Sequence, residues 1–299
     1  MEEVASQGDV SGDWFCAKGR MIECRRRPLI MGIVNVTPDS FYDGGRYIDS
    51  NQAVAHACRL VEQGADILDI GAESTRPGAD PVTEEEELAR VVPVVAALAG
   101  QVPVPISVDT TKSAVALAAL DAGASIINDV SALRWDREMA SVVAQAGAAV
   151  ILMHMQGTPH TMQVAPRYHH VVTEVADFLE ERLHAAVEAG ISKTHIVLDP
   201  GIGFGKLLEH NLEILDGLSV FTRLRRPLLV GASRKSFIGQ LTGRPPEHRE
   251  WGTAAAVAIA VDRGAGILRV HDVAATADIV TVAAAIRSKG CATRQEHHA

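Results

Sequence analysis

Apolar runs rich in Ile, Val and Leu recur along the chain from Leu29 onward, and each run ends in a polar residue. A loop containing Gly, Pro, Thr or Ser follows each run, and then comes a longer stretch with helical period. Because the runs are continuous rather than alternating, they predict strands buried on both faces, as in a parallel sheet. Eight runs fit this description: Leu29–Val34, Asp66–Ile70, Pro105–Val108, Ser125–Asn128, Ala149–Met153, His195–Leu198, Pro227–Ala232 and Gly266–Val270.

Helical stretches separate these runs, and the repeat averages about 34 residues, the size of a strand–helix–strand unit. An open doubly wound sheet usually carries a glycine fingerprint in its first strand–helix turn, whereas residues 35–40 read Asn-Val-Thr-Pro-Asp-Ser. Eight units without a break in composition therefore predict an α/β fold, a (β/α)8 TIM barrel. The clearest helical stretches are Gln52–Gln63, Glu84–Leu98, Thr111–Ala122, Val171–Ala189 and Thr253–Asp262.

The segment before the first run predicts a small separate element. Residues 14–24 indicate a short N-terminal β-hairpin that turns at Lys18-Gly19 and is placed to plug the barrel floor. We therefore divide the chain into an N-terminal tail and hairpin over 1–28, the barrel over 29–289, and a loose C-terminal tail over 290–299.

Composition and charge restrict the partners. Lys and Arg number 28 against 37 Asp and Glu, so the net charge is −9 and the chain is a poor ligand for nucleic acids or anionic membranes. The four cysteines form no CxxC pair, no signal peptide opens the chain, and no apolar run reaches the length of about 20 residues that a membrane helix needs. These features predict a cytoplasmic protein with small-molecule substrates.

Polar side chains follow every predicted strand. The loops after the strands of a TIM barrel line one face, which carries the active site. Helix capping explains a single Asp after a strand, but it does not require Lys235, Arg269 or His271 at such positions. The full set is Asn35, Glu73, Ser74, Asp109, Asn128, His154, Asp199, Ser233, Arg234, Lys235, Arg269 and His271.

The chemistry of this set indicates a heterocycle and a phosphate. Carboxylate and amide oxygens suit a flat ring with amino and N–H donors, and they come from Asp109, Asn128 and Asp199. Positive or donor groups suit phosphate oxygens, and they come from Arg76, Arg269 and His271. Oxygen ligands of the kind that Mg²⁺ takes beside substrate phosphates come from Asn35 and Asp39. The residues therefore suggest a transferase.

Two other patterns have simpler explanations. The stretch Gly201–Lys206 resembles a phosphate loop, but Leu207 replaces the Ser or Thr of a Walker motif and the glycine spacing differs. We interpret it as a loop whose backbone approaches a planar ligand closely. The His and Met residues between His154 and Met162 are more typical of packing and loop positions than of a soft-metal site.

Eight strings in order along the barrel resemble the signature motifs of the dihydropteroate synthase family, pterin-binding TIM barrels. The match covers nearly everything from residue 29 to about residue 288. The strings are Met31–Phe41 with Asp43-Gly44-Gly45, Asp69–Gly78, Ser107–Thr110, Ile127–Val130, Met153–Gly157, Leu198–Lys206, Ser233–Ser236 and Arg269–Val273.

The resemblance implies a transferase of folate biosynthesis with Mg²⁺ as cofactor. It would condense 6-hydroxymethyl-7,8-dihydropterin diphosphate with 4-aminobenzoate to give 7,8-dihydropteroate and diphosphate. The implied pterin contacts are Asp109, Asn128, Met153, Asp199, Phe204 and Lys235. The implied diphosphate contacts are Asn35, which also ligates Mg²⁺, Ser74, Arg76, Arg269 and His271. The implied aminobenzoate contacts are Phe41, Thr75, Pro77, Ser233 and Lys235. The implied catalytic set is Asn35, Arg76, Lys235, Arg269 and His271, with loops 36–49 and 74–83 as lids.

Two rival functions share the fold. A pterin-dependent methyltransferase has the same carboxylate and Asn grip on the pterin but no diphosphate to bind, so Asn35, Arg76, Arg269 and His271 argue against it. An inactive pterin-binding homologue would not need to keep Asn35, Arg269 and His271, so their presence argues against this function as well. A sulfonamide-insensitive variant can keep every motif above, so the sequence leaves sulfonamide discrimination open.

Two helices predict self-association. Thr253–Val261 is apolar on nearly every side, as is much of Ala274–Ile286, whereas an outer barrel helix should present a polar face to water. We therefore expect a homodimer, the assembly that the family resemblance also implies. The alternative is that these Ala-rich helices simply lie close to the barrel.

Overall fold

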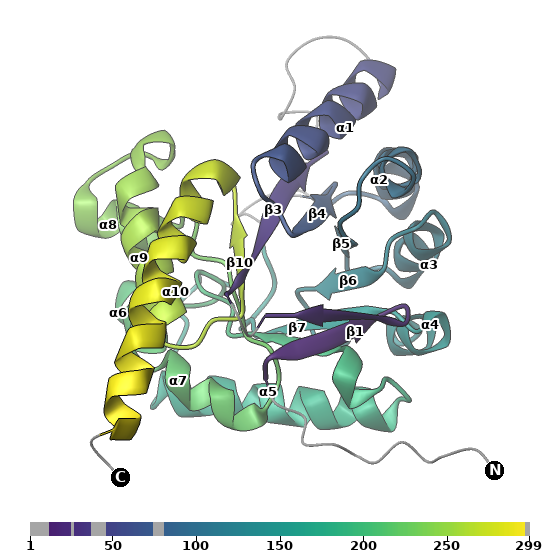
Figure 1. Ribbon diagram of the computed structural model, residues 1–299. Helices are drawn as coiled ribbons and strands as arrows, with labels where there is room; N and C mark the ends of the chain where they lie inside the picture. Colours follow the sequence, from purple (N-terminus) through teal and green to yellow (C-terminus); the bar gives the residue numbers. More distant parts are fainter. Residues whose placement is uncertain (1–11, 25–26, 37–45, 74–80, 297–299) are drawn as a thin grey trace, which may run out of the picture.

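The computed structural model describes residues 12–24, 27–36, 46–73 and 81–296 of the chain. Eight parallel strands form one sheet in the order β8-β7-β6-β5-β4-β3-β10-β9 (Figure 1). They are β3 (Leu29–Asn35), β4 (Ile67–Gly71), β5 (Ile106–Asp109), β6 (Ile126–Asp129), β7 (Ala149–Met153), β8 (Ile196–Asp199), β9 (Leu229–Val230) and β10 (Ile267–Val270). Each predicted apolar run thus coincides with one strand, and five of the strands extend one residue beyond their run.

The two ends of this sheet meet. Leu198 in β8 forms a parallel bridge with Leu228, which immediately precedes β9, and this bridge joins the first and last strands of the order. The strands are buried along their length, so their continuous apolar sequences are explained by core on both faces. The predicted (β/α)8 barrel is confirmed.

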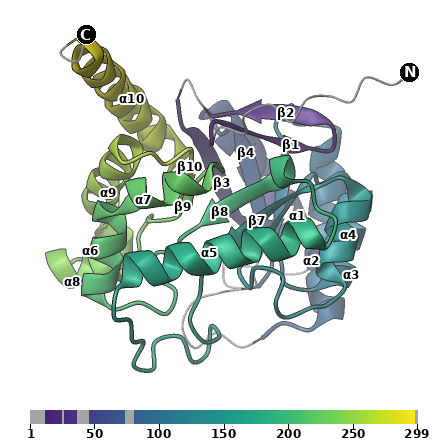
Figure 2. The same cartoon turned by 90° about the horizontal axis from the view of Figure 1, so that it is seen from below.

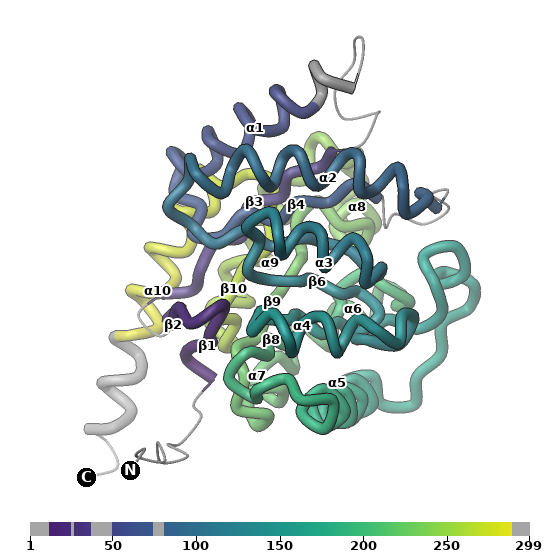
Figure 3. Tube along the Cα trace, turned by 90° about the vertical axis from the view of Figure 1, so that its right-hand side faces the viewer, coloured from purple at the N-terminus to yellow at the C-terminus, as the bar shows by residue number. Residues whose placement is uncertain are grey.

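Helices surround the barrel, and α1 to α4 pack side by side in chain order, as the tube in Figure 3 shows. Local sequence sets their ends: Thr83 accepts a hydrogen bond from the Glu86 amide at the start of α2, and Gly147 adopts a positive φ of 58° at the end of α4. The helices are α1 (Arg46–Glu62), α2 (Glu84–Ala99), α3 (Ser113–Asp121), α4 (Met139–Ala146), α5 (Val171–Glu188), α6 (Leu208–Asp216), α7 (Leu218–Phe221), α8 (Ser236–Thr242), α9 (Glu250–Asp262) and α10 (Val273–Glu296).

The N-terminal hairpin covers one end of the barrel (Figure 2). Strands β1 (Trp14–Ala17) and β2 (Arg20–Glu23) pair antiparallel, and the turn residues Lys18 and Gly19 both have positive φ, as a tight hairpin turn requires. Phe15 and Ile22 belong to one buried cluster with inward-facing residues of seven barrel strands. The hairpin therefore plugs the barrel floor, as the sequence predicts.

The last helix is longer than expected. The sequence analysis predicts a loose tail over 290–299, whereas α10 continues to Glu296. One glycine inside a helix costs about 1 kcal/mol, which does not end a helix that is already formed, and Cys291–Glu296 consists of residues that a helix accommodates.

Within the described residues, no helix is long and apolar enough to cross a membrane.

Candidate active site

The carboxyl ends of neighbouring strands bring the predicted polar residues to one edge. Asn35 of β3 lies in register with Gly71 of β4, Gly71 with Asp109 of β5, and Asp109 with Asn128 of β6. On the next strands, Met153 of β7 pairs in register with Asp199 of β8. Residues far apart in the sequence therefore form a single row along the barrel rim.

Arg269 of β10 lies between two carboxylates at this rim. Its Nε donates to Asp69 Oδ2 at 2.6 Å, and its Nη2 donates to Asp109 Oδ2 at 2.9 Å. Asn128 Nδ2 also donates to Asp69 Oδ2, at 3.2 Å. Asp69 thus joins Arg269 to Asn128, and Arg269 joins both to Asp109.

Burial and charge oppose each other in this group. Burial raises the pKa of Asp109 to about 7, although Arg269 pulls it down. Burial acts to lower the pKa of Arg269, but Asp69 and Asp109 together raise it above its ordinary value. Arg269 is therefore a permanent cation, and burial makes Asp109 easier to protonate than an ordinary aspartate.

A second group surrounds Asp199. Asp199 Oδ1 accepts a hydrogen bond from the Gly201 amide at 2.7 Å, and burial raises the pKa of this carboxyl to about 6. Lys235 places its Nζ 3.9 Å from the centre of the Phe204 ring, a cation–π contact. Burial and the charge of Arg269 lower the pKa of Lys235 to about 8, although Asp199 raises it. These groups can present a carboxylate and an ammonium to the same ligand.

The loop after β8 is built around a buried lysine. Gly201, Gly203 and Gly205 all have positive φ. Lys206 is 3% exposed. Its Nζ contacts His154 Nδ1 at 2.9 Å and donates to the carbonyls of Gly201 at 2.9 Å and Phe204 at 3.0 Å. Lys206 therefore holds the glycine loop from inside, and the resemblance to a phosphate loop is superficial.

His154 is part of the packing around this lysine. Burial and the neighbouring Lys206 lower its pKa to about 2, so the imidazole is neutral. Its ring packs edge-on against Phe178 with centroids 4.8 Å apart. In the part of the chain that the structure describes, no three His, Cys, Asp or Glu side chains gather as a metal site.

An apolar wall stands beside the acids. Met153 and Phe204 belong to one buried cluster with Val130, Met155 and Met162. Gly201 permits this arrangement, because a Cβ there would lie 1.9 Å from the His154 carbonyl oxygen and 3.3 Å from the Met153 Cγ. The wall offers a flat ring apolar contact next to charged hydrogen-bond partners.

Two predicted residues meet on the other side of the rim. Ser233, which follows β9, and His271, which follows β10, place Oγ and Nδ1 at 3.0 Å, and the His271 amide donates to the same Oγ at 3.3 Å. This pair joins a residue predicted for aminobenzoate to one predicted for diphosphate.

A further predicted site residue stands at the end of the first barrel strand. Asn35 is half-buried at the end of β3. Five predicted site residues lie outside the described residues: Phe41, Ser74, Thr75, Arg76 and Pro77.

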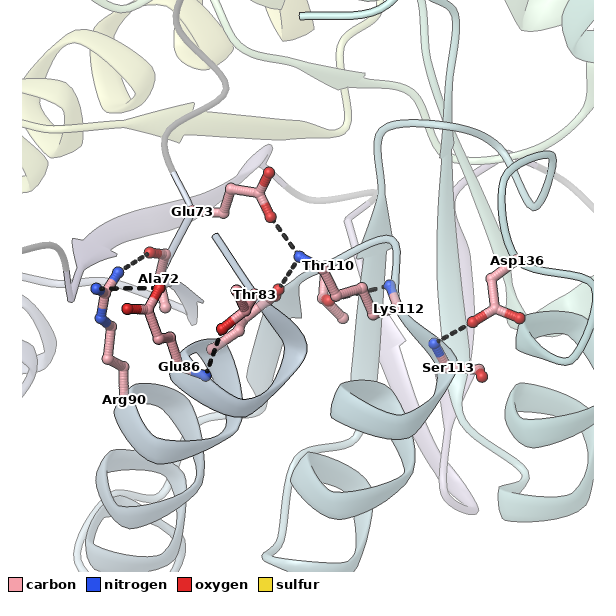
Figure 4. Close-up of polar contacts among 10 residues, drawn as sticks. Ala72, Glu73, Thr83, Glu86, Arg90, Thr110, Lys112, Ser113 and Asp136 are labelled. Carbon is pink, nitrogen blue, oxygen red and sulfur yellow. Dashed lines mark hydrogen bonds and ion pairs between the residues drawn. The ribbon is translucent and has the colours of Figure 1, made fainter. Parts of the chain in front are cut away.

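Ion pairs and a hydrogen bond hold the described ends of the connection between β4 and α2 close together, as Figure 4 shows. Lys112, which caps α3, places Nζ 2.5 Å from Glu73 Oε2 and 2.5 Å from Glu87 Oε2. Glu73 follows β4, and Glu87 lies in the first turn of α2 with its side chain 1 % exposed. Arg90 of α2 also donates to the carbonyl of Ala72, at 3.3 Å. We call Lys112, Glu73 and Glu87 the Lys112 cluster.

Sequence reasoning missed two buried residues of this site. Asp69 is fully buried in β4 and holds Arg269, and a carboxylate inside an otherwise apolar run was the available signal. Lys206 was assigned only to a loop, because its role depends on carbonyls and a histidine brought together by folding.

Comparisons with known proteins agree with this geometry. A family described as pterin binding enzymes matches residues 31–271. The dihydropteroate synthase of Neisseria meningitidis serogroup C is 52% identical over 256 residues, which are 84% of this chain and 90% of that protein. The chain belongs to the dihydropteroate synthase family.

Solved structures of this family share the fold of the chain. Dihydropteroate synthase from Xanthomonas albilineans with 4-aminobenzoic acid has a TM-score of 0.86 at 50% identity and covers 93% of this chain and 99% of that one. The Xanthomonas albilineans enzyme in complex with 7,8-dihydropteroate has a TM-score of 0.83 at 48% identity, with 92% and 98% covered. The chain is therefore a transferase of the folate pathway built on the barrel of its relatives.

Proposed function

We propose that this enzyme joins the methylene carbon of 6-hydroxymethyl-7,8-dihydropterin diphosphate to the amine of 4-aminobenzoate and releases diphosphate. The observation that carries this proposal is the row at the barrel rim in which Arg269 touches Asp109 at 2.9 Å. Such a row offers carboxylates to a nitrogen-rich ring and a cation to phosphate within one site. The activity is that of dihydropteroate synthase, the name of the relatives above.

The pterin would lie against Met153 and Phe204. Both side chains are buried in one apolar cluster, and Lys235 already contacts the Phe204 ring. Asp109, Asn128 and Asp199 would accept or donate the hydrogen bonds of the ring edge. When ring N–H groups occupy Asp109, Nη2 of Arg269 would become available to the diphosphate.

The diphosphate would lie against Asn35, Arg269 and His271, with Ser74 and Arg76 from outside the described residues. Mg²⁺ keeps several waters and takes one or two protein oxygens beside substrate phosphates, so a single amide oxygen from Asn35 suits it. Asn35 stands at the end of β3, in the same row as Asp109, which fits this role. When bound, the ion would neutralise charge on the diphosphate.

The aminobenzoate would lie beside Ser233 and Lys235. Ser233 is 7% exposed and fixed by His271, so its hydroxyl has a defined direction. Phe41, Thr75 and Pro77 would complete this pocket. Whether it discriminates between 4-aminobenzoate and sulfonamides is tested by measuring inhibition by a sulfonamide against a range of aminobenzoate concentrations.

The reaction needs an easy departure of diphosphate, because an aromatic amine is a weak nucleophile. The C–O bond to diphosphate breaks and leaves positive charge on the pterin methylene, and the C–N bond then forms. Asp109 and Asp199 face a ring that becomes more positive towards the transition state, so their binding strengthens where it accelerates the reaction. Arg269 and His271 stabilise the leaving diphosphate. The amine proton leaves late, to diphosphate or water.

The deciding experiment measures diphosphate release by the purified enzyme with both substrates and Mg²⁺. We expect one diphosphate for each dihydropteroate formed, and none when 4-aminobenzoate is omitted. Binding of the pterin without diphosphate release would favour a pterin-dependent methyltransferase or an inactive homologue and would overturn the proposal.

We also propose a cytoplasmic homodimer. An apolar hollow of about 580 Å³ lies between α6, α8 and α9 and is lined by Leu215, Leu241 and Ile259 among others. Ile259 is 48% exposed and Val282 of α10 is 60% exposed, although both helices should present polar faces to water. A second copy that covers these side chains would explain their exposure.

A further inference from the structure

The turn that carries Lys235 has an unfavourable backbone conformation. Arg234 lies between β9 and α8 with a φ of 58°, in the left-handed region that residues other than glycine avoid. Its side chain is exposed. A residue held in this way beside an active site points to contacts that force the conformation.

Two residues from the start of α9 supply those contacts. The Arg234 amide donates to Thr253 Oγ1 at 3.0 Å. Arg249 Nη1 donates to the carbonyl of Arg234 at 3.0 Å and to the carbonyl of Lys235 at 3.3 Å. The amide and the carbonyl of Arg234 are therefore both bound by side chains from the start of α9. The flanking elements, β9 and α8, do not provide these contacts.

The guanidinium of Arg249 is itself held in place. Its Nε donates to the carbonyl of Arg244 at 2.9 Å. It packs against Gly239 of α8, where a Cβ would lie only 2.2 Å from the Arg249 Nη2. Thr253 is 9% exposed, so its hydroxyl is shielded from water. The contacts on Arg234 thus belong to a built arrangement rather than to a loose surface side chain.

The held turn fixes the position of Lys235. The lysine crosses to the glycine loop, where a Cβ on Gly203 would lie 3.0 Å from the Lys235 Cδ, and its Nζ lies 3.9 Å from the centre of the Phe204 ring. We propose that Arg249 and Thr253 are positioning residues, which hold Arg234 in the left-handed region so that the Lys235 ammonium stays over Phe204. We call these two residues the Arg249 clamp. The inference rests on the proposed placement of the pterin beside Lys235.

The test compares pterin binding in variants of the whole enzyme. Arg249→Met removes the donors and keeps an apolar stem, Thr253→Val removes the acceptor, and Gly239→Ala displaces the guanidinium. The probe is 6-hydroxymethylpterin, titrated by calorimetry. The matched control is Arg287→Met, because Arg287 Nη1 also donates to a backbone carbonyl, that of Val261, at 3.0 Å.

We expect Arg249→Met to weaken pterin binding and lower kcat/KM for the pterin substrate by about 10- to 100-fold, because small misplacements of a contacting group have effects of this size. Gly239→Ala and Thr253→Val should change both in the same direction, and Arg287→Met should leave them unchanged. Since glycine adopts positive φ without a steric penalty, Arg234→Gly in the Arg249→Met background should restore part of the loss. Hydrogen exchange at the Arg234 amide should rise in Arg249→Met.

Three results would overturn the inference. The first is a pterin affinity of Arg249→Met within twofold of the wild type, and the second is an equal loss of affinity in Arg287→Met. The third is a loss of affinity in Arg249→Met that parallels a loss of thermal stability and that Arg234→Gly does not relieve. Pterin titration and hydrogen exchange do not require turnover. If the wild type binds pterin but releases no diphosphate, the proposed function fails while these measurements still decide the inference.

Discussion

Arg269 Nη2 donates a hydrogen bond to Asp109 Oδ2 at 2.9 Å, so a side chain predicted for the diphosphate is the partner of one predicted for the pterin. Asp69 holds the same guanidinium from the other side at 2.6 Å. A pterin whose ring N–H groups donate to Asp109 would therefore release one end of Arg269, while Asp69 keeps the other. Under the proposed placement of the substrates, binding of the ring and readiness of the phosphate site would be coupled through this pair.

We expect Arg269→Ala to slow diphosphate departure by about 100-fold or more, because a preorganised charge beside the leaving group is lost. The KM for 4-aminobenzoate should change much less. Steady-state kinetics with diphosphate detection separates the two effects. A change confined to the aminobenzoate KM would mean that the phosphate site is misplaced.

The control for this variant is another arginine–aspartate pair. Arg223 Nη2 lies 2.9 Å from Asp177 Oδ1, with side chains 49% and 63% exposed. Exposed pairs of this kind contribute about 0–1 kcal/mol, so Arg223→Ala should affect neither turnover nor stability appreciably. Arg269→Ala should also lower the free energy of unfolding, since it leaves Asp69 and Asp109 buried without their cation.

Asp199→Asn should weaken pterin binding by about 1.5–3 kcal/mol, because a charge-assisted hydrogen bond to a buried ring is lost. The affinity for 6-hydroxymethylpterin, measured by calorimetry above pH 7, checks this value. Asp216→Asn is a suitable control, since this aspartate is 79% exposed and pairs only with Arg263 among the described residues. Unchanged pterin affinity in Asp199→Asn would contradict the role assigned to the carboxylate.

The Asp199 carboxyl should make the free energy of unfolding and the pterin affinity depend on pH in opposite directions. Burial raises its pKa to about 6 in the folded protein, against an ordinary value near 3.8, so the folded state holds the proton more tightly. Its contribution to stability is therefore present below pH 4 and is lost as the pH rises through 6. Pterin affinity should rise over the same range. Unfolding free energies at pH 5 and pH 7.5, compared with those of Asp199→Asn, isolate this contribution.

The sequence was sufficient for the barrel because its signal is local. Each apolar run, such as Ala149–Met153, overlaps its strand closely, and the polar residue at its end marks the rim. The contacts within the rim were not predictable in this way. Asp69 meets Arg269 across 200 positions of sequence, and they come together because β4 and β10 both pair with β3. The Arg249 contacts likewise depend on how α9 packs beside the turn before α8.

Ile259→Lys tests the predicted homodimer. A charge in the hollow between α6, α8 and α9 would have to be buried against the second copy, so we expect the variant to be monomeric. Light scattering after size-exclusion chromatography should give twice 31.8 kDa for the wild type and 31.8 kDa for the variant. Val187→Lys on α5, where Val187 is 42% exposed, is the control and should remain dimeric. A wild-type mass of 31.8 kDa would reject the dimer.

The Lys112 cluster predicts a stability effect at the base of the connection between β4 and α2. Lys112→Met leaves the buried carboxylate of Glu87 without its cation, and breaking such a pair costs about 3–5 kcal/mol when fully buried. Because Lys112 is 24% exposed, we expect about 2 kcal/mol, measured by denaturant unfolding. Adding Glu87→Leu removes the unpaired charge and should recover most of this loss. If the double variant is no more stable than Lys112→Met, the lysine acts through something other than Glu87.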